Sequence, residues 1–478
     1  MKTKILMVSL LIAFTSCKKK KTLGDVLITQ SNLQLELQEK IKDLVQEYVN
    51  LDIFSGIVLV AEKGVITFHK AYGLSNREKN IPNSVNTLFD IGSMNKTFTS
   101  IVIKQLAEEG KIDLNDNLTK FLSGFKDPNT NKITINHLLD HESGFGDYHT
   151  PDYFDLPLNE RKLGAIVGRA KSYQLNFEPG TEQDYSNLGY VILGAVIEKV
   201  TGKSYFDNVQ ERIVTPLNLK NTYLNDFDNL ETRIAIGYYY TPLGILVENK
   251  PIQDIPNPDG GFLSTTEDIL KFYRSYYYDD MLLSKKFKSS DPFFKYLNEL
   301  PEGEAVGAAG GFEGFNTALF QVYSDDLTII VFANMDEPVA ENIASNVLNL
   351  YRGETPDKPQ LPAIQNIRKN YEKHGTDYIK ENFQELTINF HPSDPKDIVL
   401  NNLGYAYLYE AKDNKKALEI FKLNTELFPK IANCWDSLGE ALAMSKNKSE
   451  AIKAYKKALE LNPDMDTAHQ ALQKLSKE

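Results

Sequence analysis

Several features that would decide the class of a protein at once are scarce in this sequence. It has only two cysteines, Cys17 and Cys434, and if Cys17 carries a lipid, as its context below predicts, no intrachain disulfide can form. Positive charge is not in excess: the formal net charge at pH 7 is -12, which argues against nucleic acid as a partner because nucleic-acid binders present a basic face. The apolar run near the N-terminus, "ILMVSLLIAF", is too short to span a bilayer.

The sequence is long enough and apolar enough to form more than one domain. A chain of 478 residues exceeds one typical domain, and 42% hydrophobic residues are enough to fill two or more cores. We therefore expect a soluble, globular protein with at least two domains.

The N-terminal residues predict an export signal over 1–17. Two early lysines precede the apolar run, and small residues follow it before Cys17. A cysteine at this place resembles the lipobox of bacterial lipoproteins, which implies that Cys17 is the lipidated first residue of a membrane-anchored protein facing the periplasm or the cell surface. Phe14 departs from the usual Leu, and the alternative is a plain secretory peptide with a chance cysteine. Residues 18–29, which begin with "KKKK", are then a solvated tether beside lipid headgroups.

The pattern of the next 320 or so residues indicates an α+β domain over 30–352. Residues 31–50 have apolar side chains at helical spacing, and "FSGIVLVAEKGVITFHKAYG" reads as a β-hairpin. A second hairpin lies far away, where "TALFQVYS" and "LTIIVFAN" flank Asp325-Asp326. We expect one antiparallel sheet built from both ends of the domain, with a helical, loop-rich insertion between them.

A Pro-rich and charged segment, 353–362, predicts a linker, and the residues beyond it are repetitive. Two units share an offset of 34 to 35 residues: Leu400, Leu403, Gly404, Tyr407, Ala417, Phe421 and Pro429, then Trp435, Leu438, Gly439, Leu442, Ala451, Tyr455 and Pro463. Period and residue types resemble the tetratricopeptide repeat, a helix pair that often binds partner proteins. We therefore expect an all-α repeat domain over 363–478, whose first part, 363–394, is a degenerate repeat. The alternative is a solubilising appendage.

The stretch "FDIGSMNKTFTS" places Ser93 three positions before Lys96 at the start of a predicted helix. Residues i and i+3 share a helix face, and burial of this apolar helix would disfavour a charged ammonium, so Lys96 suits the role of base for a nucleophilic serine. Free backbone N–H groups at a helix entrance can also hold an oxyanion. The alternative is a helix cap beside an ordinary lysine, because the same spacing recurs at Ser16, Ser123, Ser393 and Ser445.

A second polar cluster, Tyr185-Ser186-Asn187, follows a Pro-Gly turn and precedes an apolar helix. In that frame the Tyr185 phenol could share or relay a proton, and the Asn187 amide could bind a substrate carbonyl. The Tyr-x-Asn pattern is weak by itself, since it recurs elsewhere in the chain.

Four stretches in order carry a family resemblance: "FDIGSMNKTFTS", "ITINHLLDHESGF", "FEPGTEQDYSNLGYVILG" and "DGGFLSTTEDILKF". Together they resemble the serine β-lactamase and penicillin-binding protein superfamily, in its class C branch. The resemblance implies an antiparallel sheet with flanking helices plus an all-helical part. It also implies that Ser93 is the acylated nucleophile, Lys96 its base, and Tyr185 and Asn187 the second motif. No cofactor or metal is expected.

Other residues in these stretches favour structural roles. His141 lies at a predicted helix exit, which favours a structural duty over catalysis. Ser264-x-x-Glu267 has the capping-box pattern of a helix start, and Gly260-Gly261 permit a tight turn.

The third motif of the superfamily, a Lys or His followed by a small residue and Gly on the strand bordering the cleft, is degenerate here. In "VGAAGGFEGFNTALF" the cation position falls on Ala308, while Gly310 and Gly311 remain open to a substrate backbone, with the Gly311 N–H as second oxyanion donor. Another group, such as Arg161, Arg169 or Arg233, could supply the missing charge.

The sequence therefore favours a serine hydrolase that acts through an acyl-enzyme on an ester, amide or peptide, as an esterase or D-peptidase does. One alternative is a catalytically weak protein that binds cell-wall fragments or peptides and uses its repeats for a protein partner. A true β-lactamase is disfavoured because such enzymes engage the drug carboxylate with the missing cation.

Overall fold

The computed structural model describes residues 23–249, 254–336, 338–389 and 395–477. The predicted signal segment, Cys17 and the lysine run after it lie outside the described residues. Within the described ranges, no helix combines the length and the apolar character that a membrane crossing requires.

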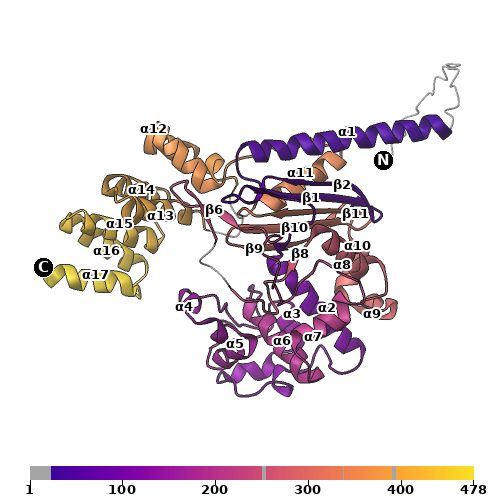
Figure 1. Ribbon diagram of the computed structural model, residues 1–478. Helices are drawn as coiled ribbons and strands as arrows, with labels where there is room; N and C mark the ends of the chain where they lie inside the picture. The colour runs from indigo at the N-terminus through magenta and orange to yellow at the C-terminus, as the bar shows by residue number, and fades with distance from the viewer. Residues whose placement is uncertain (1–22, 250–253, 337, 390–394, 478) are drawn as a thin grey trace, which may run out of the picture.

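A five-stranded antiparallel sheet in the order β2-β1-β11-β10-β9 forms the centre of the first domain (Figure 1). Strand β1 pairs with β11 along its whole length, which confirms that the sheet joins strands from the two ends of the domain. Both predicted hairpins are present, and Lys63, Gly64 and Asp326 adopt the positive φ angles that their tight turns need. The strands are β1 (Gly56–Glu62), β2 (Val65–Tyr72), β9 (Ala305–Phe312), β10 (Phe315–Val322) and β11 (Leu327–Ala333).

Three short two-stranded ladders lie outside this sheet. They pair β3 (Leu74–Asn76) with β4 (Ile81–Pro82), β5 (Phe89–Asp90) with β8 (Leu263–Ser264), and β6 (Tyr238–Tyr240) with β7 (Leu246–Glu248).

The two faces of the sheet are covered by different helices (Figure 1). Along β1 the side chains alternate: Val58 and Val60 face α1 (Leu23–Asn50) and α11 (Val339–Tyr351), while Ile57 and Leu59 join the larger core on the other face. The predicted N-terminal helix is therefore present, and it begins at Leu23, inside the predicted tether.

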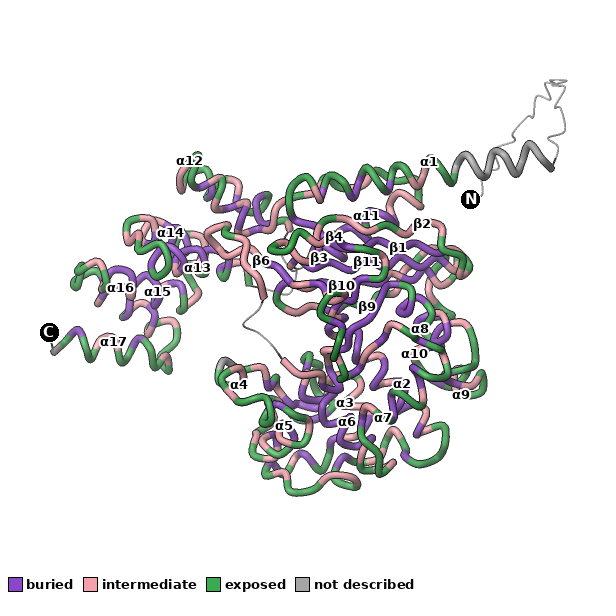
Figure 2. Tube along the Cα trace, viewed as in Figure 1, coloured by how far each residue is buried: buried purple, intermediate pink, exposed green. Residues whose placement is uncertain are grey.

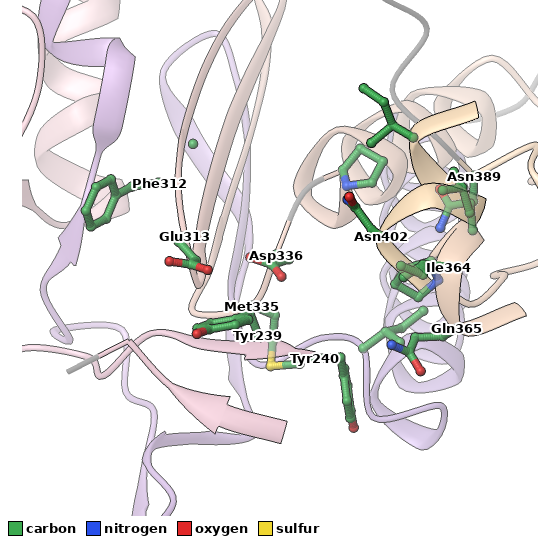
Figure 3. Close-up of a pocket in the computed structure, with 17 residues that line it drawn as sticks. Tyr239, Tyr240, Phe312, Glu313, Met335, Asp336, Ile364, Gln365, Asn389 and Asn402 are labelled. Atoms are coloured by element: carbon green, nitrogen blue, oxygen red, sulfur yellow. The ribbon is translucent and has the colours of Figure 1, made fainter. Parts of the chain in front are cut away.

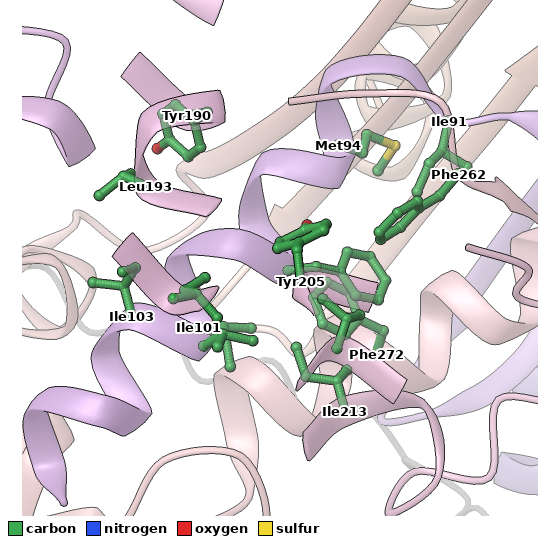
Figure 4. Packing of buried hydrophobic residues seen from close by; sticks show 14 of the residues in the cluster. Ile91, Met94, Ile101, Ile103, Tyr190, Leu193, Tyr205, Ile213, Phe262 and Phe272 are labelled. Atoms are coloured by element: carbon green, nitrogen blue, oxygen red, sulfur yellow. The ribbon is translucent and has the colours of Figure 1, made fainter. Parts of the chain in front are cut away.

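The insertion forms a helical lobe beneath the second face, and Figure 2 shows its buried residues continuous with those of the sheet. Phe98 stacks on Phe272 with ring centroids 3.8 Å apart and meets Phe262 edge-on. Phe272 and Phe262 are labelled in Figure 4. Helices and single turns of this part of the domain are η1 (Gly92–Met94), α2 (Asn95–Glu108), η2 (Leu118–Lys120), η3 (Pro128–Lys132), α3 (Ile135–Leu139), α4 (Pro151–Phe154), η4 (Leu158–Glu160), α5 (Leu163–Ala170), α6 (Asn187–Thr201), α7 (Tyr205–Val209), η5 (Gln210–Val214), α8 (Thr266–Tyr278), α9 (Lys285–Ser290) and α10 (Pro292–Glu299).

The residues after 362 form helices with a core of their own. A β-carbon on Gly404 would lie 2.6 Å from the Phe421 ring, and one on Gly439 would lie 2.8 Å from the Tyr455 ring, so glycine is what lets these helices approach. The elements are α12 (Ala363–Leu386), which is interrupted at Gly375, then α13 (Asp397–Tyr405), η6 (Ala406–Glu410), α14 (Asn414–Leu427), α15 (Ala432–Met444), α16 (Lys448–Leu461) and α17 (Asp466–Lys477).

The predicted linker, 353–362, is anchored rather than free. Asp357 exchanges two hydrogen bonds with the Asn346 side chain, and Leu361 packs against the core between α1 and α11. The domain boundaries themselves stay a prediction.

The structure corrects the predicted start of α8. The cap is Thr265, whose hydroxyl accepts the Asp268 N–H, and not Ser264 with Glu267. Ser264 is still in strand β8, where its side chain hydrogen-bonds Thr222. Backbone pairing of β5 with β8 thus displaces the cap by one residue.

Candidate active site

Ser93 lies in the single turn η1, between strand β5 and helix α2. Gly92 adopts φ 50 and donates its N–H to the Asp90 carboxylate, 2.8 Å away, so the chain turns sharply before the serine. Most of α2 is buried behind it, while Ser93 itself stays partly exposed. The predicted placement of Ser93 at a helix entrance is therefore confirmed.

Lys96 is 6% exposed and makes three hydrogen bonds. Its Nζ lies 2.9 Å from Ser93 Oγ, 2.6 Å from Asn187 Oδ1 and 2.9 Å from the Asp259 carbonyl oxygen. These acceptors match the three N–H donors of an ammonium. The Lys96 amine is thereby held in contact with the Ser93 hydroxyl.

Tyr185 reaches the same hydroxyl from the other side. Its OH lies 2.7 Å from Ser93 Oγ, and the Lys96 ammonium lies 4.9 Å from the centre of its ring. Ser186, the next residue, caps α6 by accepting the Gly189 N–H. The cap fixes Tyr185 just before the helix and Asn187 at its first position, which brings Tyr185 to Ser93 and Asn187 to Lys96.

Asn187 is held between two protein groups. Its Oδ1 accepts from Lys96, and its Nδ2 donates to Asp147 Oδ2 at 2.6 Å, which sets the orientation of the amide. His149 Nδ1 lies 3.4 Å from the same Nδ2. Asn187 thus positions Lys96 in this structure, and its predicted contact with a substrate carbonyl stays a prediction.

His141 has the structural role that its place in the sequence favours. It adopts φ 60 after α3, accepts the Ser186 N–H through Nδ1, and stacks on Tyr185 with ring centroids 4.6 Å apart. Burial, together with the nearby charge of Lys96, lowers the pKa of His141 to about 4. The ring is therefore neutral at pH 7 and keeps Nδ1 available as an acceptor.

Two residues that the sequence interpretation missed, Asp147 and His149, lie behind Asn187. Burial alone would raise the pKa of Asp147 and lower that of His149, but the neighbouring groups together outweigh burial in both: the contact between the two side chains at 3.4 Å, the Asn187 amide beside Asp147, and the Asp259 and Asp254 carboxylates near His149. The pKa of Asp147 falls to about 2, and that of His149 rises above its usual value. They form an ion pair that holds the Asn187 amide, and no local pattern in "GFGDYHT" marks it.

The loop before β8 is the other missed part of the site. Besides the Asp259 carbonyl that accepts from Lys96, the Asn257 carbonyl accepts from Asn95 and the Pro258 carbonyl accepts from Thr99. The Asp259 carboxylate accepts from Tyr148 OH at 3.0 Å, and burial raises the pKa of this carboxyl. Gly261, between this loop and β8, adopts φ 94, a backbone conformation that favours glycine.

Strand β9 borders the site as the edge strand of the sheet. A β-carbon on Gly92 would lie 2.8 Å from the Gly311 nitrogen, so this nitrogen is next to the turn that carries Ser93. Gly311 lies opposite Asn316, one pair from the two-residue turn, and in an antiparallel hairpin its N–H therefore points away from β10. The predicted oxyanion glycine is brought to the serine.

No cation stands at the third motif in the described structure of β9. Ala308 packs partly buried against the main core. The three arginines considered as substitutes each donate to groups elsewhere: Arg161 to the Leu156 carbonyl, Arg169 to the Glu160 carbonyl, and Arg233 to Asn221. Over the described ranges, His, Cys, Asp and Glu side chains do not gather in threes that could hold a metal ion.

Known proteins resemble this chain in sequence and in fold. Residues 41–351 match the family model described as Beta-lactamase, and residues 432–465 match the tetratricopeptide repeat. Penicillin-binding protein 4* of Bacillus subtilis (strain 168) is 29% identical over 344 residues, covering 65% of this chain and 75% of that protein. The teichoic acid D-alanine hydrolase of Staphylococcus aureus (strain NCTC 8325 / PS 47) is 32% identical over 303 residues, covering 60% and 72%.

Solved structures give the same fold. FmtA from Staphylococcus aureus superposes with a TM-score of 0.56 at 26% identity, covering 68% of this chain and 89% of that one. The D-amino acid amidase of Ochrobactrum anthropi SV3 shares the fold with a TM-score of 0.57 at 21% identity, covering 66% and 99%. The chain belongs to the β-lactamase family, and a tetratricopeptide repeat follows its family domain.

Proposed function

We propose that this protein is a serine hydrolase that cleaves an ester or amide through an acyl-enzyme on Ser93. The observation that carries the proposal is the convergence of Lys96 Nζ and Tyr185 OH on one hydroxyl, at 2.9 and 2.7 Å. Membership of the β-lactamase family and similarity to a relative named as a hydrolase support it. The Tyr185-Ser186-Asn187 motif also supports the finer assignment to the class C branch.

In the first step Ser93 Oγ attacks the carbonyl carbon and forms a C–O bond. The hydroxyl proton passes to the Lys96–Tyr185 pair, one member of which is deprotonated in the reactive state. The pair then returns the proton to the departing alcohol or amine as the bond to the leaving group breaks. In the second step water attacks the acyl carbon and loses a proton to the same pair. The bond to Ser93 Oγ then breaks, the acid leaves, and the pair returns the proton to Ser93 Oγ.

The negative charge on the carbonyl oxygen develops next to two backbone donors. The Ser93 N–H at the entrance of α2 and the outward N–H of Gly311 would form the oxyanion hole. Gly310 lets β9 come close enough to η1 for this arrangement.

Substrate class follows from the third motif. Because Ala308 supplies no charge, we propose that the enzyme prefers esters and amides without a carboxylate next to the scissile group. Hydrolysis of β-lactams, which carry such a carboxylate, would be weak.

The remaining assignments concern location and partners. We propose export and lipid anchoring at Cys17, on the strength of the N-terminal sequence, with the hydrolase facing the periplasm or the cell surface. The tetratricopeptide repeat supports binding of a protein partner by the C-terminal helices.

Steady-state hydrolysis of a neutral aryl ester by the wild type and by the Ser93→Ala protein tests the proposal. We expect Ser93→Ala to lower kcat/KM by about 10³-fold or more, whereas Ser100→Ala, on the adjoining helix α2 but away from the contacts of Ser93, leaves it unchanged. A wild type that binds such esters without hydrolysing them would instead favour a binding protein built on the same cleft.

A further inference from the structure

A cavity of ≈ 490 Å³ lies between the hydrolase domain and the C-terminal helices (Figure 3). One wall comes from β6, from the turn between β9 and β10, and from the chain after β11; the other comes from α12 and α13. Gln365 of α12 donates to the Thr241 carbonyl at 2.6 Å, which ties the two walls together. Residues far apart in sequence thus build a single cavity.

The cavity is connected to the candidate active site through β9. Gly311, the predicted oxyanion donor, is one of its lining residues, and Phe312 and Glu313 follow on the same strand and turn. At about 3.3 Å per residue along a strand, the backbone of Glu313 lies roughly 7 Å from that of Gly311. A substrate bound at Ser93 can therefore extend into the cavity within a few bonds of its carbonyl carbon.

The lining has one sign of charge. Glu313 and Asp336 are its two carboxylates, and no Lys, Arg or His is among its 17 lining residues. Glu313 is an exposed residue, no hydrogen bond or ion pair to another described residue engages its carboxylate, and partial burial raises the pKa of this group. A free carboxylate beside a cavity favours a cationic ligand.

Aromatic rings and amides complete the same environment. Figure 3 shows Tyr239 and Tyr240 on the hydrolase side of the cavity, and Gln365 and Asn402 on the side of the helices, whereas the Phe312 ring points away from them. Ammonium groups bind to aromatic faces as well as to carboxylates, and the apolar parts of the wall accommodate the stem that carries the charge.

We infer that this cavity is a substrate subsite that binds an ammonium-bearing group of the ester or amide cleaved at Ser93. This inference rests on the proposed hydrolase function and adds its substrate class: a cationic group a few bonds from the scissile carbonyl, in place of the carboxylate for which β9 has no partner. The C-terminal helices then contribute directly to substrate selection, through α12 and α13.

Paired esters test the subsite in the full-length protein. One pair shares a 4-nitrophenyl leaving group and differs in the acyl chain, which ends in an ammonium or in a methyl group; the other pair shares a neutral acyl group and compares choline with 3,3-dimethylbutyl alcohol. We expect kcat/KM to favour the ammonium member of at least one pair by about tenfold at low salt, and by less at high salt. Equal rates in both pairs, with the neutral esters still hydrolysed through Ser93, would overturn the subsite and leave the hydrolase proposal standing.

Two variants locate the preference. Glu313→Gln should reduce it to less than about threefold, whereas Glu304→Gln, at a carboxylate outside the cavity, should leave it intact. Asn402→Lys adds a positive charge on α13 without touching β9, and should lower ammonium turnover while raising that of an ester ending in a carboxylate. If Glu313→Gln lowers all turnover, the Asn402→Lys result decides; an unchanged preference in Asn402→Lys would contradict the inference. If the wild type hydrolyses none of these esters and Ser93 stays unmodified, the hydrolase proposal itself is refuted.

Discussion

Gly310 and Ile91 are in direct contact: a β-carbon on Gly310 would lie 2.0 Å from the Ile91 carbonyl oxygen. Thr317, opposite Gly310 on β10, donates its hydroxyl to the same carbonyl at 3.1 Å. The sheet edge and the turn that carries Ser93 are therefore locked together at one point. The spacing between Ser93 and strand β9 is set there.

The contact predicts that Gly310→Ala is harmful to activity beyond its effect on stability. The methyl group must push β9 away from η1, so we expect a loss of about 1–3 kcal/mol of unfolding free energy and a fall in kcat/KM of about 10²-fold or more as the oxyanion donor is displaced. Urea unfolding and ester kinetics measure the two effects. Gly307→Ala is the matched control, because its β-carbon would meet its nearest neighbour at an ordinary 3.4 Å.

Tyr185→Phe should abolish proton transfer without disturbing the fold. The hydroxyl that contacts Ser93 Oγ is lost, and we expect kcat to fall by about 10²- to 10⁴-fold, with an unchanged near-ultraviolet circular dichroism spectrum because the ring is half exposed. Tyr296→Phe, at a similarly exposed ring, should have no effect. Activity of Tyr185→Phe within about threefold of wild type would remove Tyr185 from the proposed pair.

The sequence reveals the parts of this site that depend on local geometry. Ser93 and Lys96 are three residues apart across the start of helix α2, and Tyr185 and Asn187 flank a helix cap, so their spacing and context predict both pairs. Asp147, His149 and the Asp259 carbonyl were missed because they reach Asn187 and Lys96 across 38 to 163 residues. Only the packed fold brings such groups together.

The fold shows the same division. Alternating and helical patterns predict both hairpins, the sheet assembled from the two ends of the domain, and the repeat helices. The cap of α8 differs by one residue, because pairing of β8 with β5 keeps Ser264 in the strand. The cavity between β9 and α12 could not be foreseen, since it depends on how two separately patterned segments pack, with Leu243 of the first against the core of the second.

His141 makes stability depend on pH in a defined window. Its pKa is about 4 when folded and about 6.5 in an unfolded chain, so between these values the unfolded state binds more protons and unfolding free energy rises with pH. For a half-buried ring we expect a gain of about 1–2 kcal/mol from pH 4 to 6.5, after allowance for solvent screening. The measurement is urea unfolding of wild type and His141→Asn across this range.

Asparagine is the informative replacement at this position. It tolerates the positive φ of His141 and can accept the Ser186 N–H, but it does not titrate. The difference between the two proteins should therefore rise with pH up to about 6.5 and then level off. A difference that stays flat from pH 4 to 7 would show that His141 is protonated in the folded protein as readily as in the unfolded one.

Ala308→Lys should shift specificity towards substrates with a carboxylate. A charge-assisted hydrogen bond contributes roughly 1.5–3 kcal/mol, so we expect carboxylate-bearing esters to gain about one to two powers of ten in kcat/KM relative to their neutral analogues. Ala309→Lys is the control, because successive side chains on β9 point to opposite faces. If the wild type already prefers the carboxylate analogue, another group supplies the charge and the assignment of the third motif is wrong.

The most direct test of the account is to identify the residue that acts as the nucleophile. The full-length protein is treated with an aryl phosphonate that reacts with activated serines, and intact-mass measurement is followed by peptide mapping. The account predicts one adduct per chain, on the peptide that carries Ser93, and none in Ser93→Ala. Two results would contradict the account: an adduct on a different serine, or a wild type that hydrolyses the neutral aryl ester but carries no adduct after treatment.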